Sequence, residues 1–156
     1  MFNVTVNTEI ARPAEVVFDY IADLTNNADW QFGIESTEWT SALRVDVGST
    51  YDQTMEYKGL VTGYEITAIE PGRSITVETR AGATIPTTVT RTVQVLNESR
   101  CRVRVDLSGR LPGWRVITRP LAKRMIRRSI ASDFRRLKHR MEEENDPPTG
   151  DPSDPG

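Results

Sequence analysis

The stretch ITRPLAKRMIRRSIASDFRRLKHRM, residues 117–141, decides the fold class of this chain. Apolar side chains recur in it every three or four positions, which is the spacing of one face of an α-helix. They are Ile117, Leu121, Met125, Ile126, Ile130, Phe134, Leu137 and Met141. Because Pro120 has no amide hydrogen, we expect either a kink there or a regular helix that starts near Thr118. The stretch predicts one long amphipathic helix near the C-terminus.

The residues before this helix, from Ile34 to Gly109, alternate between polar and apolar side chains, which is typical of half-buried β-strands. Val4 and Val6 alternate in the same way, so a first strand is predicted at the N-terminus. Short turns such as EPGR at residues 70–73 separate the runs, so consecutive strands pair antiparallel. A meander this long must curl or close.

Two short helices are predicted between the first strand and the others. Pro13 suits a first helical turn, and apolar residues recur at helical spacing from Val16 to Leu24. Residues 23–29 indicate a turn or a second short helix ending at Trp30. The predicted order gives an α+β helix-grip fold, in which a curved seven-stranded antiparallel sheet wraps around the long C-terminal helix.

The length of 156 residues suits one domain, which we place at residues 1–144. Residues 145–156 are rich in Pro, Asp and Gly and predict a disordered tail. The apolar runs are too short to span a bilayer, and the N-terminus does not resemble a signal peptide. The single cysteine, Cys101, excludes an intramolecular disulfide, so we expect a cytoplasmic protein.

Four motifs of the chain resemble the SRPBCC superfamily, also called START-like, and especially its polyketide cyclase/dehydrase-like branch. They are IARPAEVVFDYIAD at 10–23 leading to Trp30, VGST at 47–50, IEPGR at 69–73 and IASDFRRLK at 130–138. The resemblance covers nearly everything before the tail. Since the motifs are turns, a helix start and a core aromatic, they indicate the fold and say little about chemistry. The resemblance implies an internal cavity for a hydrophobic small molecule.

Metal and nucleophile chemistry finds little support in the sequence. The chain has one histidine and one cysteine, so a zinc site of the usual kind is excluded, and a triad that needs histidine is disfavoured. His139 lies in the basic stretch and is expected at the surface. Cys101 is in phase with Val103 and Val105, so it is expected in the core. We therefore predict no metal, no cofactor and no catalytic residue.

One face of the predicted strand near residue 53 carries large side chains with polar groups. Tyr51, Gln53, Met55 and Tyr57 share this phase. They either fill a plain core or line a mostly apolar pocket with a few polar anchors, and the resemblance favours the pocket. The candidate ligand-binding residues are Trp30, Tyr51, Gln53, Met55, Tyr57, Tyr64, Thr79, Arg91, Met125 and Ser129.

Arg91 lies on the face of its predicted strand that otherwise carries the apolar residues Val89, Val93 and Val95. A buried guanidinium needs a partner, so Arg91 binds a ligand carboxylate or pairs with Glu56 or Glu65. Alternatively a bulge turns it to solvent, which is the interpretation that we favour. Asp133 on the long helix either lies at the cavity edge or pairs with Arg136 or Arg140 in solvent.

Half of the twenty lysines and arginines fall between Arg115 and Arg140, and this segment contains a single acidic residue, Asp133. They are Arg115, Arg119, Lys123, Arg124, Arg127, Arg128, Arg135, Arg136, Lys138 and Arg140. We favour a solvated helix face over a patch for nucleic acid or anionic lipid.

Three functions follow from these features. The leading hypothesis is a carrier or sensor of a hydrophobic or polycyclic small molecule. The first alternative is a cyclase/dehydrase-like enzyme in which a tyrosine or Arg91 polarises a carbonyl. The second is an interaction module whose basic helix docks on nucleic acid, the ribosome or an anionic membrane. The sequence leaves the oligomeric state open.

Overall fold

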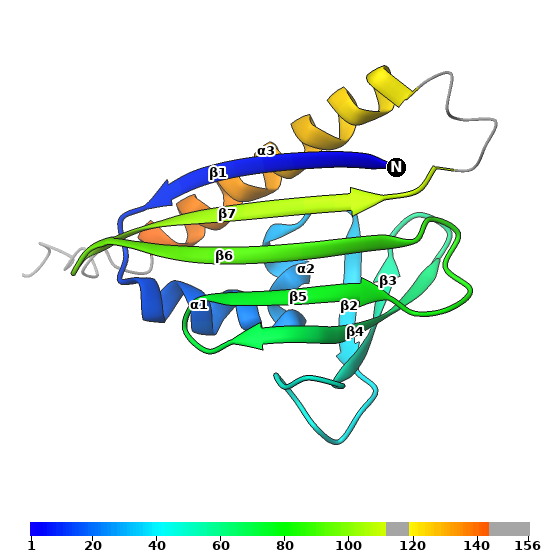
Figure 1. Ribbon diagram of the computed structural model, residues 1–156, viewed down its shortest axis with the longest axis horizontal. Helices are drawn as coiled ribbons and strands as arrows, with labels where there is room; N and C mark the ends of the chain where they lie inside the picture. The colour runs from blue at the N-terminus through cyan, green and yellow to red at the C-terminus, as the bar shows by residue number, and fades with distance from the viewer. Residues whose placement is uncertain (112–118, 144–156) are drawn as a thin grey trace, which may run out of the picture.

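The chain folds as strand, short helices, six strands and long helix, as the sequence predicted (Figure 1). The computed structural model describes residues 1–111 and 119–143. Its elements are β1 (Phe2–Ile10), α1 (Ala14–Ala22), the 3-10 turn η1 (Leu24–Asn26), α2 (Asn27–Trp30), β2 (Ile34–Trp39), β3 (Thr50–Met55), β4 (Val61–Glu70), β5 (Ser74–Thr79), β6 (Thr87–Asn97), β7 (Arg100–Gly109) and α3 (Arg119–Glu143). The predictions for Ile117, for Thr118 and for the tail at 145–156 lie outside the described residues.

The described strands form one antiparallel sheet in the order β1-β7-β6-β5-β4-β3-β2. Every neighbour follows in sequence except β1, which pairs with the last strand, β7, along its whole length. The sheet curls into a half-barrel, and Figure 1 shows α1, α2 and α3 on one side of it. The helix-grip prediction is confirmed. None of the described helices is both long and apolar enough to span a lipid bilayer.

α3 packs its C-terminal half into the curl of the sheet. Phe134, Leu137 and Met141 are buried there together with residues of β1 and α1. Pro120 lies in the first turn of the described helix, where its missing amide hydrogen is tolerated.

The prediction that Leu121 and Met125 belong to the buried apolar face of α3 was wrong, because both side chains are exposed. Met125 directly precedes Ile126, and successive helical residues point about 100° apart, so they cannot share one face. Ile126 is the half-buried member of this pair. The N-terminal half of α3 therefore carries a second, outward-facing apolar stripe.

The prediction that the strand extends to Tyr57 was wrong, because β3 ends at Met55. Lys58 and Gly59 both have positive φ, at 58° and 60°, and form a tight turn. The amide of Met55 donates to the carbonyl of Leu60 across it. Tyr57 thus belongs to the turn and is exposed, although its position continues the phase of Tyr51.

Candidate functional site

Two neighbouring pockets, which we call the inner and the outer chamber, lie between α3 and the concave face of the sheet. The inner chamber has a volume of about 170 Å³, and the outer chamber about 490 Å³. Leu107 of β7 contributes to the walls of both. The inner wall includes Trp30, Val89, Arg91, Val105, Asp133 and Phe134. The outer wall is mostly apolar and includes Phe2, Met55, Tyr64, Ile85 and Ile126. The outer chamber is within the usual size of small-molecule sites.

Arg91 lies in the wall of the inner chamber and is only 6% exposed. Its Nη1 donates to the carbonyl of Ile21 and to Oδ1 of Asn27, both at 3.1 Å. The favoured interpretation, a bulge that turns Arg91 to solvent, was wrong. β6 keeps a regular register here, with Arg91 opposite Ile75 and Val105, so the side chain stays on the buried face.

The Arg91 guanidinium has no carboxylate within salt-bridge distance among residues 1–111 and 119–143, so the suggested pairing with Glu56 or Glu65 is also wrong. Burial lowers the pKa of Arg91 from its usual value, while Tyr51, Tyr64 and Asp133 oppose that shift. Hydrogen bonds to neutral carbonyl and amide oxygens hold this cation in place. The inner chamber therefore presents a buried positive charge without a neutralising partner in contact.

Asp133 of α3 faces the same chamber and is also bound to surface groups. It forms an ion pair with Arg136 at 3.3 Å and accepts a hydrogen bond from the amide of Phe32 at 3.1 Å. Both alternatives raised for this residue, a place at the cavity edge and a pair with Arg136, are therefore realised. Burial raises the pKa of the Asp133 carboxyl, and the Phe32 amide, Arg136 and Arg91 oppose the increase.

Trp30 lines the inner chamber and also carries an unpaired polar group. The side chain is 2% exposed, and its Nε1 has no hydrogen-bond partner among the described residues. One side of the indole contacts the ring of Phe134, with centroids 5.3 Å apart. An unpaired buried donor is costly, so this N–H lowers the stability of the fold.

Tyr51 and Tyr64 stack on adjacent strands, with ring centroids 5.2 Å apart and planes 10° from parallel. Burial raises the pKa of both phenols, and Arg91 opposes the increase in each. Both hydroxyls are therefore neutral donors near pH 7. Tyr64 also reaches the outer chamber, whereas Tyr51 supports it from behind.

The structure brings together five of the ten predicted ligand-binding residues around the two chambers. Trp30 and Arg91 line the inner chamber, Met55 and Tyr64 line the outer one, and Tyr51 stacks on Tyr64. Binding roles for these residues stay predictions.

The other five lie outside the chamber walls. Gln53 accepts a weak hydrogen bond from Asn27 at 3.4 Å, which places it behind Arg91. Thr79 accepts a hydrogen bond from the amide of Thr87 on the next strand, at 3.0 Å. The remaining three, Tyr57, Met125 and Ser129, are exposed.

Sequence reasoning missed Asn27, which is fully buried and joins Arg91 to Gln53. No local signal distinguishes this asparagine from its neighbours in a turn-rich segment. The lining residues Leu107 and Ile130 were also missed as site residues. Their sequence positions did indicate that they face inward, because each lies in phase with the buried residues of its own strand or helix. The two residues excluded from chemistry are placed as predicted, with Cys101 buried and His139 on the surface beside Glu143.

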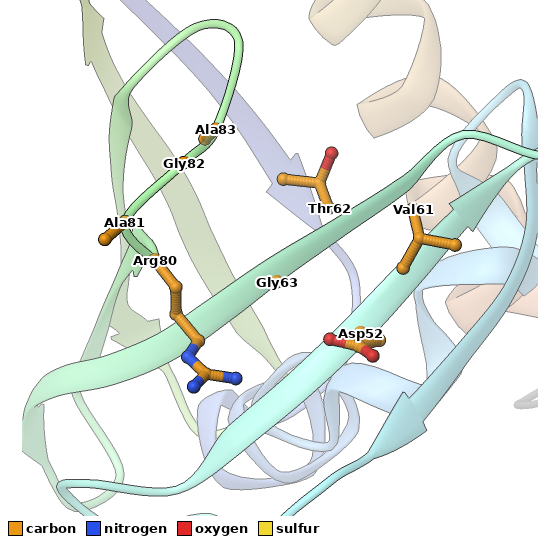
Figure 2. Close-up of a pocket in the computed structure, with 8 residues that line it drawn as sticks. All are labelled: Asp52, Val61, Thr62, Gly63, Arg80, Ala81, Gly82 and Ala83. Carbon is orange, nitrogen blue, oxygen red and sulfur yellow. The ribbon is translucent and has the colours of Figure 1, made fainter.

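A further depression of about 410 Å³ lies on the opposite face of β4 (Figure 2). Figure 2 shows Asp52 and Arg80 on one face of the sheet, flanking Gly63, while Thr62 points to the other face. All residues that line the depression are exposed or half-buried. The depression thus lacks the buried polar group that distinguishes the inner chamber. The described residues also contain no group of His, Cys, Asp or Glu arranged to hold a metal ion.

Comparisons with known proteins agree with this architecture. The family described as "Polyketide cyclase / dehydrase and lipid transport" matches residues 1–142. No curated protein matches the chain in sequence. Among solved structures, the START superfamily protein from Mycobacterium smegmatis has a TM-score of 0.74 at 16% identity, with 92% of this chain and 99% of that chain covered.

Two of the similar structures are described as aromatase/cyclase proteins. ZhuI from a Streptomyces species has a TM-score of 0.71 at 16% identity, with 96% of this chain and 98% of that chain covered. The di-domain ARO/CYC protein BexL has a TM-score of 0.77 at 14% identity. The match covers 94% of this chain but 48% of BexL, so the chain spans about half of that protein's length. These likenesses show a shared fold. Since the family match covers nearly the whole described structure, the chain belongs to the polyketide cyclase/dehydrase and lipid transport family.

Proposed function

We propose that this protein binds an elongated or polycyclic apolar molecule that carries one oxygen-rich polar end. Arg91 holds the polar end in the inner chamber beside the Trp30 ring, and the apolar body fills the outer chamber. The observation that carries the proposal is the buried Arg91 guanidinium. It lines the inner chamber, and no carboxylate of the described residues lies within salt-bridge distance of it. A carboxylate or carbonyl oxygen on the ligand would complete its coordination.

The apolar walls of the outer chamber supply the driving force in this proposal. Each Å² of apolar ligand surface removed from water contributes about 25 cal/mol, so a ligand that buries about 200 Å² gains about 5 kcal/mol. Because the proposal involves binding and no chemical step, the protein would act as a carrier or a sensor of this ligand. The match to a family described by lipid transport supports this class of ligand.

A matched pair of ligands tests the proposal. Long-chain fatty acids, sterols and aromatic polyketides are screened by thermal shift and native mass spectrometry, and each acid that binds is compared with its methyl ester. We expect the acid to bind more tightly than the ester. Arg91→Met should weaken acid binding roughly 10- to 100-fold, because a charged hydrogen bond is lost. Arg80→Met removes an exposed arginine on the other face and should bind normally. Binding of no compound in the panel would contradict the proposal.

A second candidate is cyclisation or dehydration of a polyketide chain. Two aromatase/cyclase proteins share the fold, and Tyr64 and Arg91 could polarise a substrate carbonyl in a chamber that excludes water. Turnover of a poly-β-ketone by the wild type, lost in Tyr64→Phe with binding retained, would favour this enzyme. Binding without turnover, equal in the wild type and Tyr64→Phe, would favour the carrier or sensor.

A further inference from the structure

The basic residues of α3 fall into two groups with different partners. In the C-terminal half most are paired, namely Arg136 with Asp133, Lys138 with Glu142, His139 with Glu143 and Arg140 with Asp29. In the N-terminal half the exposed basic residues are Lys123, Arg124, Arg127 and Arg128. None of these four forms an ion pair with any residue of 1–111 or 119–143. A solvated helix face thus accounts for the C-terminal half of α3, while the N-terminal half keeps a concentrated positive charge that no described residue neutralises.

Large apolar side chains are exposed at the same end of the molecule. On α3, Leu121 and Met125 are 62% and 63% exposed. In the β3–β4 turn, Tyr57, Leu60 and Val61 are more than half exposed. Scattered apolar residues are normal on a surface, whereas several at one end of a molecule indicate a contact surface.

Two members of this group lie where the outer chamber reaches the surface. Leu60 and Val61 are exposed and also belong to the chamber wall, together with Ile126 of α3. Figure 1 shows the first turns of α3 at the same end of the molecule as the β5–β6 loop, whose Ile85 lines that wall. We define the rim as Tyr57, Leu60, Val61, Leu121 and Met125 with the four unpaired basic residues.

We propose that the rim is a docking surface for an anionic lipid bilayer. Apolar side chains of this kind insert among the head groups, while lysine and arginine contact lipid phosphates. A single-stranded nucleic acid is usually bound with aromatic side chains on which its bases stack, and Tyr57 is the one aromatic residue of this group among the described residues. The chain as a whole has a net charge of −2, so attraction to an anionic surface comes from the rim and not from the overall charge.

Docking in this orientation turns the mouth of the outer chamber toward the bilayer. A lipid-soluble ligand could then pass between membrane and cavity without crossing water. The docking itself goes beyond the proposed cavity function and can be measured with no cavity ligand present. The two proposals therefore fail separately.

The test is co-sedimentation with lipid vesicles. The wild type is compared on vesicles of phosphatidylcholine with 30% phosphatidylglycerol and on phosphatidylcholine alone, at low and at physiological salt. We expect binding to the anionic vesicles that weakens with salt and little binding to the neutral ones. Each basic residue near an anionic bilayer contributes roughly fivefold to partitioning, so replacing all four by glutamine should reduce it by at least about 100-fold.

Two further variants separate rim docking from general charge effects. A quadruple control, Arg73→Gln, Arg100→Gln, Arg104→Gln and Arg135→Gln, lowers the net charge equally at exposed positions and should bind like the wild type. Leu121→Gln with Met125→Gln leaves the charge unchanged and should weaken binding about tenfold. Glutamine is a good helix former, so α3 should be retained, which circular dichroism checks.

Several results would overturn the docking proposal. They are absence of binding to anionic vesicles, equal losses in the rim and control quadruples, and an unchanged affinity of the Leu121/Met125 variant. Competition by a soluble acidic polypeptide at the same charge concentration as the vesicles would identify an acidic protein as the partner and would also overturn it.

Discussion

Arg91 on β6 lies face to face with Trp30 at the end of α2, with its guanidinium carbon 5.1 Å from the indole centroid. The contact joins two residues that are distant in sequence, and both belong to the wall of the inner chamber. A cation over an indole is stabilised by the ring quadrupole, most strongly where water is excluded. Trp30 thus positions the charge that the proposed function requires.

Trp30→Phe should leave the free energy of unfolding within about 1 kcal/mol of the wild type. The smaller ring leaves a void, but an unpaired buried N–H that costs about 1–3 kcal/mol is removed at the same time. Trp30→Ala, which also removes the ring against Phe134 and Arg91, should lose about 3–5 kcal/mol. Urea denaturation measures both. Equal losses in the two variants would show that the N–H already has a partner.

Asp133→Asn should gain stability relative to the wild type as the pH rises. Because the pKa of this carboxyl is raised on folding, its favourable contribution is complete below its unfolded value of about 3.9. That contribution is lost as the pH rises through the folded pKa, and the asparagine does not titrate. Urea denaturation of both proteins at several pH values between about 3 and 7 gives the difference, and a difference that is flat with pH would contradict the expectation.

Glu142→Gln provides a comparison of opposite sign. The pKa of Glu142 is lowered, because Lys138 and the Ala11 amide stabilise its charged form against the cost of burial. Its contribution is present above the unfolded pKa and is lost as the pH falls through the folded one, so this variant should lose stability relative to the wild type as the pH rises.

Gly109→Ala should destabilise the protein by about 1–3 kcal/mol through overpacking. A Cβ on Gly109 would lie 2.8 Å from Cε1 and Cζ of the Phe2 ring on the paired strand. The ring would have to leave its place in the outer chamber wall. In a double-mutant cycle with Phe2→Leu, measured by denaturation, the loss from Gly109→Ala should shrink. Additive losses would place the strain elsewhere.

Leu137→Ala and Met125→Ala form a matched pair on α3. Leu137 is fully buried against the sheet, so its truncation should cost about 2–5 kcal/mol. Met125 is exposed, so its truncation should change stability by less than about 0.5 kcal/mol. Thermal and urea denaturation measure both. Similar costs would mean that α3 does not lie in the curl of the sheet as described.

Local sequence patterns were sufficient to predict the helices and strands, because apolar residues recur in each of them with the spacing of a helix or of a strand. The alternation in β7 places Cys101, Val103 and Val105 inside, and all three are buried. The turn signals separate the strands at the positions where the structure turns. No local signal indicates the pairing of β1 with β7, and this pairing was not predicted.

The candidate site was harder to predict because its key contacts are long-range. The partners of Arg91 are 64 and 70 positions away in the sequence, so nothing near Arg91 indicates whether its guanidinium can be buried. Tyr57 illustrates the opposite error. It follows the strand phase, but the positive φ of Lys58 ends the strand before it.

The pairing of β1 with β7 has a consequence for how the chain acquires its structure. Thr5 and Asp106, which face each other across that pair, are 101 positions apart. During synthesis the first strand must wait until almost the entire sheet has left the ribosome, with its valines exposed to other chains meanwhile. Contacts of such high sequence separation slow folding, and unpaired strand edges invite association. Chaperone dependence should therefore be concentrated at the N-terminal strand.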